Sequence, residues 1–138
     1  MDFFRICIFP RKKNKTIQRI ENHSWKMWMK VVSVYDGDTI TVICIFRGKM
    51  VRWRCRLIGY DAPEMRSKVS EEKEKAIKAK EFLETMLPKY VFKGQCRGTD
   101  KYGRLLLDLK YKKLSISTIM VNHKLGHPYD GGTKKSWI

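Results

Sequence analysis

The sequence contains no apolar run long enough to cross a membrane. Its most apolar N-terminal stretch, Phe3–Phe9, is interrupted by Arg5, whereas a membrane-spanning helix needs about 20 residues. No basic segment precedes this stretch, as one would in a cleavable signal peptide. The sequence therefore predicts neither a signal peptide nor a transmembrane segment, and it favours an intracellular location.

Cysteine is scarce, and no two cysteines stand at C-x-x-C spacing. Because this spacing is absent, the cysteines indicate neither a zinc knuckle nor a dithiol redox site. An even number of cysteines is compatible with two disulfides in a secreted protein. Because no signal peptide is predicted, we expect reduced thiols instead. The cysteines are Cys7, Cys44, Cys55 and Cys96.

Acidic residues are also few: 14 Asp and Glu stand against 30 Lys and Arg, which gives a formal net charge of +16. A field of this sign attracts polyanions and raises their association rate. Nucleic acid, an anionic membrane surface and simple solubility all remain open on charge alone. A hydrophobic content of 43% in 138 residues excludes a wholly disordered chain and fits one domain with a small core.

The chain divides into a basic N-terminal arm, residues 1–29, and a domain, residues 30–138. The arm lacks a sustained strand or helix pattern, and the pattern changes at Val31. At the end of the arm, Trp25, Met27 and Met29 alternate with Lys26, Trp28 and Lys30, an arrangement that fits the start of the first strand. The boundary between arm and domain therefore stays open.

Short stretches rich in β-branched and aromatic residues predict a sheet of five strands. Arg47-Gly48 is placed to turn a hairpin between the second and third. In the third strand, the side chains of Arg52, Arg54 and Arg56 are expected to face away from the core. They form either a solvated surface or a basic stripe that contacts phosphates. The predicted strands are Val31–Val34, Thr39–Phe46, Lys49–Leu57, Tyr90–Cys96 and Arg104–Tyr111.

Two helices are predicted. The first begins at Ser70, whose side chain can cap free backbone amides, and is closed by Pro88. The second runs from about Ser117 to Gly126, a glycine suited to a helix C-terminus. Five short strands with an embedded helix indicate a mainly β, α+β fold: a five-stranded Greek-key barrel of the oligonucleotide-binding (OB) type with two to three helices.

Two aspartates are expected to meet at one rim of this barrel. Asp38 begins a strand after a D-G turn, and Asp61 lies in the loop that leaves another strand. Pro63 favours an extended backbone at Ala62, which turns the Ala62 carbonyl outward. Two carboxylates and a carbonyl suit calcium, which prefers oxygen ligands. The predicted metal ligands are therefore Asp38, Asp61 and Ala62.

The residues around this metal site favour phosphoryl transfer. Arg56 and Arg104 are placed to hold a phosphate through planar guanidinium groups, and Glu64 is placed to reach an attacking water. Asp36-Gly37-Asp38 alone is more typical of a hairpin turn than of a metal site. The three acid- and arginine-bearing segments taken together favour the nuclease interpretation.

These segments resemble three motifs of the staphylococcal nuclease (thermonuclease) family. The motifs are D-G-D-T at Asp36–Thr39, R-L-x-G-x-D-x-P-E at Arg56–Glu64 and T-D-K-Y-G-R at Thr99–Arg104. They occur in the family's order, and the resemblance extends from about Lys30 to Tyr129. The joint occurrence is more specific than any single motif. The family's fold is the barrel predicted above.

The resemblance implies calcium-dependent hydrolysis of DNA and RNA that leaves 5′-hydroxyl and 3′-phosphate ends. Arg56, Glu64 and Arg104 match the catalytic positions, with Glu64 either accepting a proton from the water or ordering it. The resemblance further implies a substrate-binding role for Lys101, Tyr102 and Tyr129. We expect a monomer that binds DNA or RNA and needs no protein partner. The alternative is an OB-fold module that binds nucleic acid without cutting it.

Overall fold

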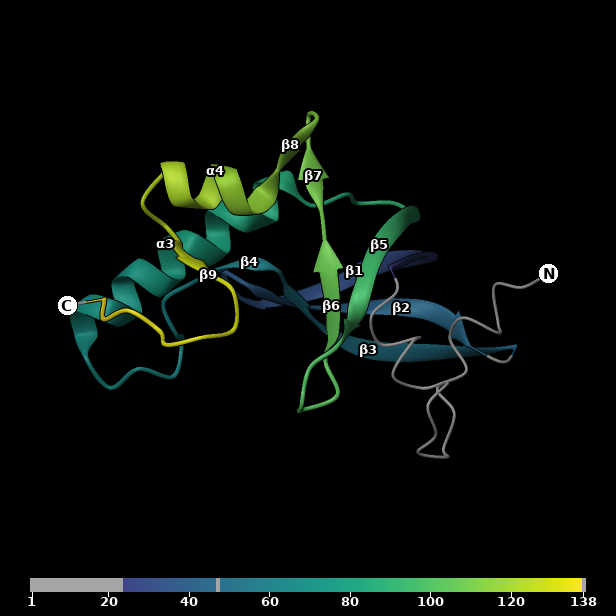
Figure 1. Ribbon diagram of the computed structural model, residues 1–138, viewed down its shortest axis with the longest axis horizontal. Coiled ribbons are helices and arrows are strands. Elements are labelled where there is room, and N and C mark those ends of the chain that lie inside the picture. The colour runs from purple at the N-terminus through teal and green to yellow at the C-terminus, as the bar shows by residue number, and fades with distance from the viewer. Residues whose placement is uncertain (1–23, 47, 138) are drawn as a thin grey trace.

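A closed barrel of five strands forms the centre of the molecule (Figure 1). The computed structural model describes residues 24–46 and 48–137. Around the barrel the strands neighbour one another in the order β1-β2-β3-β6-β5, with β3 and β6 parallel and the other pairs antiparallel. The predicted OB-type barrel is confirmed. Its strands are β1 (Trp25–Asp36), β2 (Thr39–Phe46), β3 (Lys49–Leu57), β5 (Phe92–Thr99) and β6 (Leu105–Asp108).

The first strand begins ahead of the boundary that we drew at residue 30. Trp25, Met27 and Met29 are buried and alternate with exposed neighbours, and this part of β1 pairs with β5. The alternation in the sequence had indicated such a start. The rest of the predicted arm, including Cys7, lies outside the described residues, so its role stays a prediction.

The third strand carries its arginines on the outer face, as its period of two predicts. Cys55 and Leu57 are buried in the core, whereas Arg52 and Arg54 are exposed. Arg56, at the end of the same row, is buried. The outer face of β3 is therefore exposed to solvent at Arg52 and Arg54 and buried at Arg56, where the strand reaches the other motif residues.

The long helix α3 (Ser70–Met86) packs against β1 through an apolar stripe of Ala76, Ala79, Leu83 and Met86. Its N-cap residue is Val69, which has no side chain to bond the free amides, so the expected cap by Ser70 is wrong. Ser67 instead accepts a hydrogen bond from the Val69 N–H (3.2 Å). The helix ends at Met86, before Pro88 as predicted.

The second helix, α4 (Ile116–Asn122), is shorter than the sequence predicts. It ends before Gly126 because the chain turns at Lys124, which has a positive φ of 59°. Gly126 serves a different purpose: a Cβ there would lie 2.8 Å from Cδ2 of Tyr60. The glycine allows the chain to pass against the buried Tyr60 ring.

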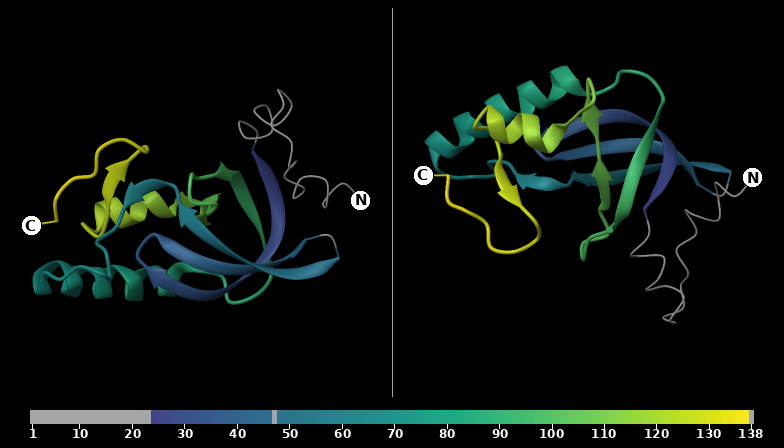
Figure 2. Two further views of the ribbon diagram at one scale, coloured as in Figure 1. Left: turned by 90° about the horizontal axis from the view of Figure 1, so that it is seen from below. Right: turned by 45° about the horizontal axis from the view of Figure 1, so that its top comes forward.

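Two small sheets complete the fold. β4 (Gly59–Asp61) pairs with β9 (His127–Tyr129), which sets Tyr129 opposite Gly59. β7 (Lys110–Tyr111) and β8 (Leu114–Ser115) form a hairpin. Figure 2 shows α3 and α4 together beside one end of the barrel, with the segment that follows β9 returning past β4. In the part of the chain that the structure describes, no helix is long and apolar enough to span a membrane.

Candidate functional site

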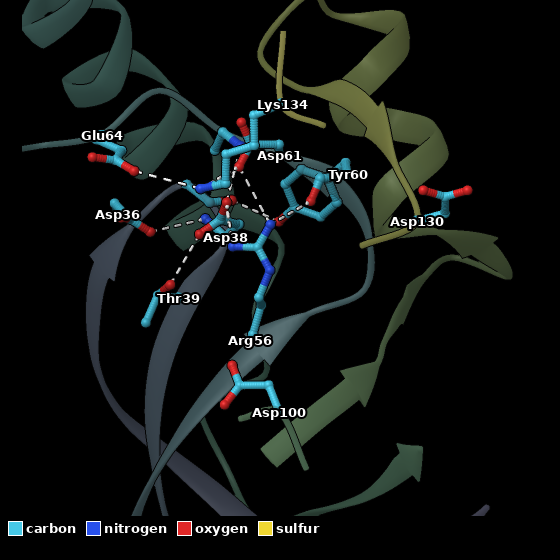
Figure 3. A network of polar contacts seen from close by, with 12 residues as sticks. Asp36, Asp38, Thr39, Arg56, Tyr60, Asp61, Glu64, Asp100, Asp130 and Lys134 are labelled. Atoms are coloured by element: carbon cyan, nitrogen blue, oxygen red, sulfur yellow. Dashed lines mark hydrogen bonds and ion pairs between the residues drawn. The ribbon is translucent and has the colours of Figure 1, made fainter. Parts of the chain in front are cut away.

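Arg56 joins the first two motifs of the sequence into one site. Its Nη1 lies 3.0 Å from Oδ2 of Asp38, and its Nη2 lies 3.3 Å from Oδ1 of Asp61. Asp38 immediately precedes β2, Arg56 lies near the end of β3 and Asp61 ends β4. Figure 3 shows the guanidinium pointing into the space between the two carboxylates. Three separate elements therefore bring the predicted residues together.

The turn before Asp38 is held rigidly. The hydroxyl of Tyr60 donates a 2.6 Å hydrogen bond to the carbonyl of Gly37, and a Cβ at Gly37 would lie 2.8 Å from Cβ of both Ala62 and Ala79. Asp38 itself accepts hydrogen bonds from the Thr39 hydroxyl (2.9 Å) and from the N–H of Ala62 (2.9 Å). The position of the Asp38 carboxylate is thus determined by the fold before any ligand binds.

Burial makes the charges of this centre strongly interdependent. Arg56 loses hydration, which acts to lower its pKa, but Asp38 and Asp61 outweigh this effect and the pKa is raised. Burial and, next, the charge of Asp38 raise the pKa of Asp36 to about 7. Removing one partner of a buried pair leaves the other charge uncompensated. The centre therefore tolerates the loss of Arg56 poorly.

Lys134, beyond β9, reaches back to the same centre. Its Nζ lies 3.2 Å from Oδ1 of Asp61 and 3.4 Å from Oε1 of Glu64. Partial burial acts to lower the pKa of Lys134, but the attraction of Asp61 raises it overall. Glu64 is otherwise exposed, with 59% of its side-chain surface accessible. A cationic side chain thus links the buried aspartate to the exposed glutamate.

Arg104 is positioned by the turn that contains the third motif. Asp100 accepts hydrogen bonds from the backbone N–H groups of Tyr102 and Arg104 (both 2.9 Å) and from Nε of Arg104 (2.7 Å). The indole N–H of Trp53 donates to the carbonyl of Gly103 (2.9 Å) and ties this turn to β3. Nη1 of Arg104 lies 3.5 Å from the Thr39 hydroxyl, which itself donates to Asp38. The third motif is therefore connected to the first.

One cleft of about 460 Å³ is lined by many of these side chains. Its wall contains the carboxylate of Asp38, the guanidinium groups of Arg56 and Arg104, and the carboxylate of Glu64. Cationic and anionic groups at a shared, partly open site suit a ligand that carries a phosphate and binds a metal ion. The cleft is also lined by Tyr35, Asp36, Thr39, Arg54, Met65, Arg66, Tyr102 and Lys134.

Comparison with known families gives a match that covers the second and third motifs of this site but not the first. The family model described as staphylococcal nuclease homologue matches residues 54–130. The chain belongs to the staphylococcal nuclease family. Membership indicates a nuclease-like or nucleic-acid-binding function and an interaction with nucleic acid. No curated protein matches the chain.

The staphylococcal nuclease motifs do not all contribute in the same way to the cleft. Asp61 is buried behind Lys134 and Arg56 and is not among the lining residues. Tyr129 lies outside the lining as well, with its ring 5.3 Å from Cζ of Arg56. Lys101 is exposed beside the Tyr102 ring (5.1 Å) and also does not line the cleft. The roles that we predicted for these residues stay predictions.

Several residues of the cleft were not singled out as site residues by sequence reasoning. Thr39 lies inside a recognised motif, and so does Asp100, which holds Arg104 without lining the cleft itself. For these two residues the motifs were the signal in the sequence. Tyr35 and Arg66 are each only a few residues from a motif, and Lys134 follows all of them. No local pattern marks these three, because their contacts join parts of the chain far apart in sequence.

The structure brings two of the predicted calcium ligands, Asp38 and Asp61, to the same centre, and the calcium site itself stays a prediction. Asp38 and Asp61 supply two buried carboxylates that share one guanidinium, and hard cations prefer such oxygens. The described residues contain no group of three His, Cys, Asp or Glu side chains that could hold a metal. Further ligands would have to come from backbone, such as the Ala62 carbonyl, or from substrate and water. Lys134 would also have to yield its contact with Asp61.

Proposed function

We propose that the protein is a calcium-dependent, sugar-nonspecific nuclease that hydrolyses phosphodiester bonds in DNA and RNA. The observation that supports this proposal is the shared cleft. It presents two guanidinium groups, from Arg56 and Arg104, together with the carboxylates of Asp38 and Glu64. A binding surface alone needs the arginines but gains nothing from carboxylates, which repel a phosphate. The combination therefore favours catalysis.

Each side chain has a role that follows from its position. Asp38, Asp61 and the Ala62 carbonyl would hold calcium, which supplies Lewis-acid activation of a phosphate oxygen when bound. Arg56 and Arg104 donate to the phosphate oxygens and stabilise the charge that grows on them in the transition state.

Glu64, exposed at the cleft, orders the attacking water or accepts its proton. The water oxygen bonds to phosphorus, the bond from phosphorus to the 5′ oxygen breaks, and a proton ends on that oxygen. The products are a 3′-phosphate and a 5′-hydroxyl. In this scheme Lys134 has to release Glu64 before the carboxylate can contact the water.

The alternative is a nucleic-acid-binding module without catalysis, and one observation favours it. Arg56 is engaged by Asp38 and Asp61, and Lys134 is engaged by Asp61 and Glu64. These ion pairs satisfy the acids within the protein, which reduces the drive to bind a cation. The two functions differ in whether calcium displaces these contacts.

Degradation of labelled single-stranded and duplex DNA, in calcium or in EGTA, distinguishes the two. We expect cleavage in calcium, none in EGTA, and none by an Asp38→Ala/Glu64→Ala double variant. An Asp108→Ala/Glu81→Ala variant, which removes two acids outside the cleft, is the matched control and should cut normally. Retention of DNA without cleavage in any divalent metal would establish the binding module instead.

A further inference from the structure

A cluster of one tyrosine and two arginines lies on the cleft wall beside the proposed catalytic residues. Tyr35 comes from β1, Arg54 from β3 and Arg66 from the loop between β4 and α3. All three line the same cleft as Arg56 and Arg104. Neither the three motifs nor the proposed catalytic steps use any of them. The cluster therefore needs an explanation of its own.

The Tyr35 side chain holds both guanidinium groups in place. Cζ of Arg54 lies 5.2 Å from the centroid of its ring, and Cζ of Arg66 lies 5.9 Å from it. Nε of Arg66 also donates a 2.8 Å hydrogen bond to the Tyr35 hydroxyl. Cation–π contacts orient an arginine without using its N–H groups. The terminal nitrogens of both arginines thus keep their donors for another partner.

Within the described residues no carboxylate forms an ion pair with this cluster, and Glu64 and Asp36 act on Arg66 only from a distance. Neither Arg54 nor Arg66 forms an ion pair with a carboxylate there, and both side chains belong to exposed residues. By contrast, Arg56, Arg97 and Arg104 each contact an aspartate. Two oriented guanidinium groups that no carboxylate contacts directly can bind an external anion.

We infer that Tyr35, Arg54 and Arg66 form a second phosphate subsite, which binds a backbone phosphate next to the one held by Arg56 and Arg104. A single nucleic-acid strand that enters the cleft would contact both groups of arginines, since one cleft contains them. The identity of the ligand rests on the proposed function. The subsite itself makes no contact with the scissile bond, so it contributes affinity for longer strands and leaves the chemistry to the other residues.

Equilibrium binding in EGTA tests the subsite without depending on cleavage. The probes are single strands of two and of twelve thymidine nucleotides, titrated at several salt concentrations. For an Arg54→Gln/Arg66→Gln variant we expect the salt slope for the longer strand to fall by about 0.7, because the subsite binds one phosphate and one phosphate contact on a single strand contributes about 0.7. Extrapolated from 1 M to 0.1 M salt, this is a loss of about fivefold in affinity. Binding of the dinucleotide should not change.

A Lys110→Gln/Lys113→Gln variant removes the same charge elsewhere. Both lysines are exposed on or beside the β7–β8 hairpin, which Figure 1 shows at the opposite end of the molecule from the β5–β6 loop. This variant should keep the wild-type slope within about 0.3, less than half of one contact. A Tyr35→Phe variant, which loses the hydroxyl that accepts from Arg66, should give a smaller fall in slope than the double arginine variant.

Each other outcome decides against the subsite. An unchanged slope in the arginine variant would overturn it, and so would an equal loss for the two-nucleotide strand, which would place both arginines at the central phosphate. Failure of the wild type to bind the longer strand would also overturn it. Calcium-dependent cleavage, measured in parallel, reports on the proposed nuclease separately: binding without cutting would retain the subsite and reject the nuclease.

Discussion

Lys134 and Asp61 are in direct contact, with Nζ of the lysine 3.2 Å from Oδ1 of the aspartate. The contact joins β4 to the segment after β9. It places the half-exposed lysine side chain against a carboxylate that is only 5% exposed. The same ammonium also contacts Glu64 (3.4 Å). Lys134 therefore acts as an internal counter-ion at the centre where calcium is proposed to bind.

Replacing Lys134 by methionine should tighten calcium binding, because the cation no longer has to displace an ammonium group from Asp61. Half-exposed ion pairs are worth at most about 1 kcal/mol, so we expect a gain of up to about fivefold in affinity. Isothermal titration of calcium into the nucleic-acid-free protein measures it. The neighbouring Lys135→Met variant is the control and should match the wild type; weaker binding by Lys134→Met would contradict the competition.

Replacing Arg104 by alanine should lower kcat by about 10²- to 10³-fold, since one charge-stabilising donor to the transition state is lost. Its contacts with Asp100 and Thr39 are only partly buried, so the fold should persist. Single-turnover cleavage in saturating calcium gives the rate. Arg97→Ala, which breaks an ion pair with Asp108 elsewhere, serves as the control, and equal rates in the two variants would remove Arg104 from the mechanism.

Replacing Arg56 by methionine should destabilise the fold by about 3–5 kcal/mol, because two buried carboxylates lose their shared partner. Urea unfolding in EGTA measures the loss. Calcium should recover part of it, since a cation on Asp38 and Asp61 replaces the missing charge. Arg54 is exposed and lies two residues earlier on β3, so the control variant Arg54→Met is expected to change stability by about 0.5 kcal/mol or less. A loss that calcium leaves untouched would count against metal binding by these aspartates.

The turn at Asp100 should make stability depend on pH in the acid range. Partial burial acts to raise the pKa of Asp100, but the hydrogen bonds from Arg104 and Tyr102 outweigh it and lower the pKa below its ordinary value of 3.8. The folded protein therefore binds this proton less readily than the unfolded chain does. The stabilisation is complete above pH 3.8 and is lost as the pH falls through the folded-state pKa.

An Asp100→Asn variant should accordingly be less stable than the wild type by about 1–2 kcal/mol near pH 6, where the charged hydrogen bonds are present. The difference should shrink as the pH falls below 3.8. Urea titrations between pH 6 and pH 3 follow it. A difference that stays constant over this range would show that the carboxylate charge is not what stabilises the turn.

Much of the barrel could be predicted because its determinants are local. The alternation in β3 and the apolar stripe of α3 place side chains on the core face whatever the surroundings are. The end of α4 could not be predicted in the same way. Gly126 has the usual signature of a helix C-terminus, yet its small size is needed for packing against Tyr60, and only the folded chain brings Tyr60 there.

The type of barrel and the three motifs that meet beside one cleft could be predicted from the sequence alone. This was possible because strand period, turn residues and motif spacing are carried by neighbouring residues. Three features could be seen only in the folded chain: Lys134 covers Asp61, Trp53 bonds the Gly103 turn, and Tyr35 orients Arg54 and Arg66. Those contacts join residues far apart in the chain, and their geometry depends on how the strands, loops and C-terminal segment pack together.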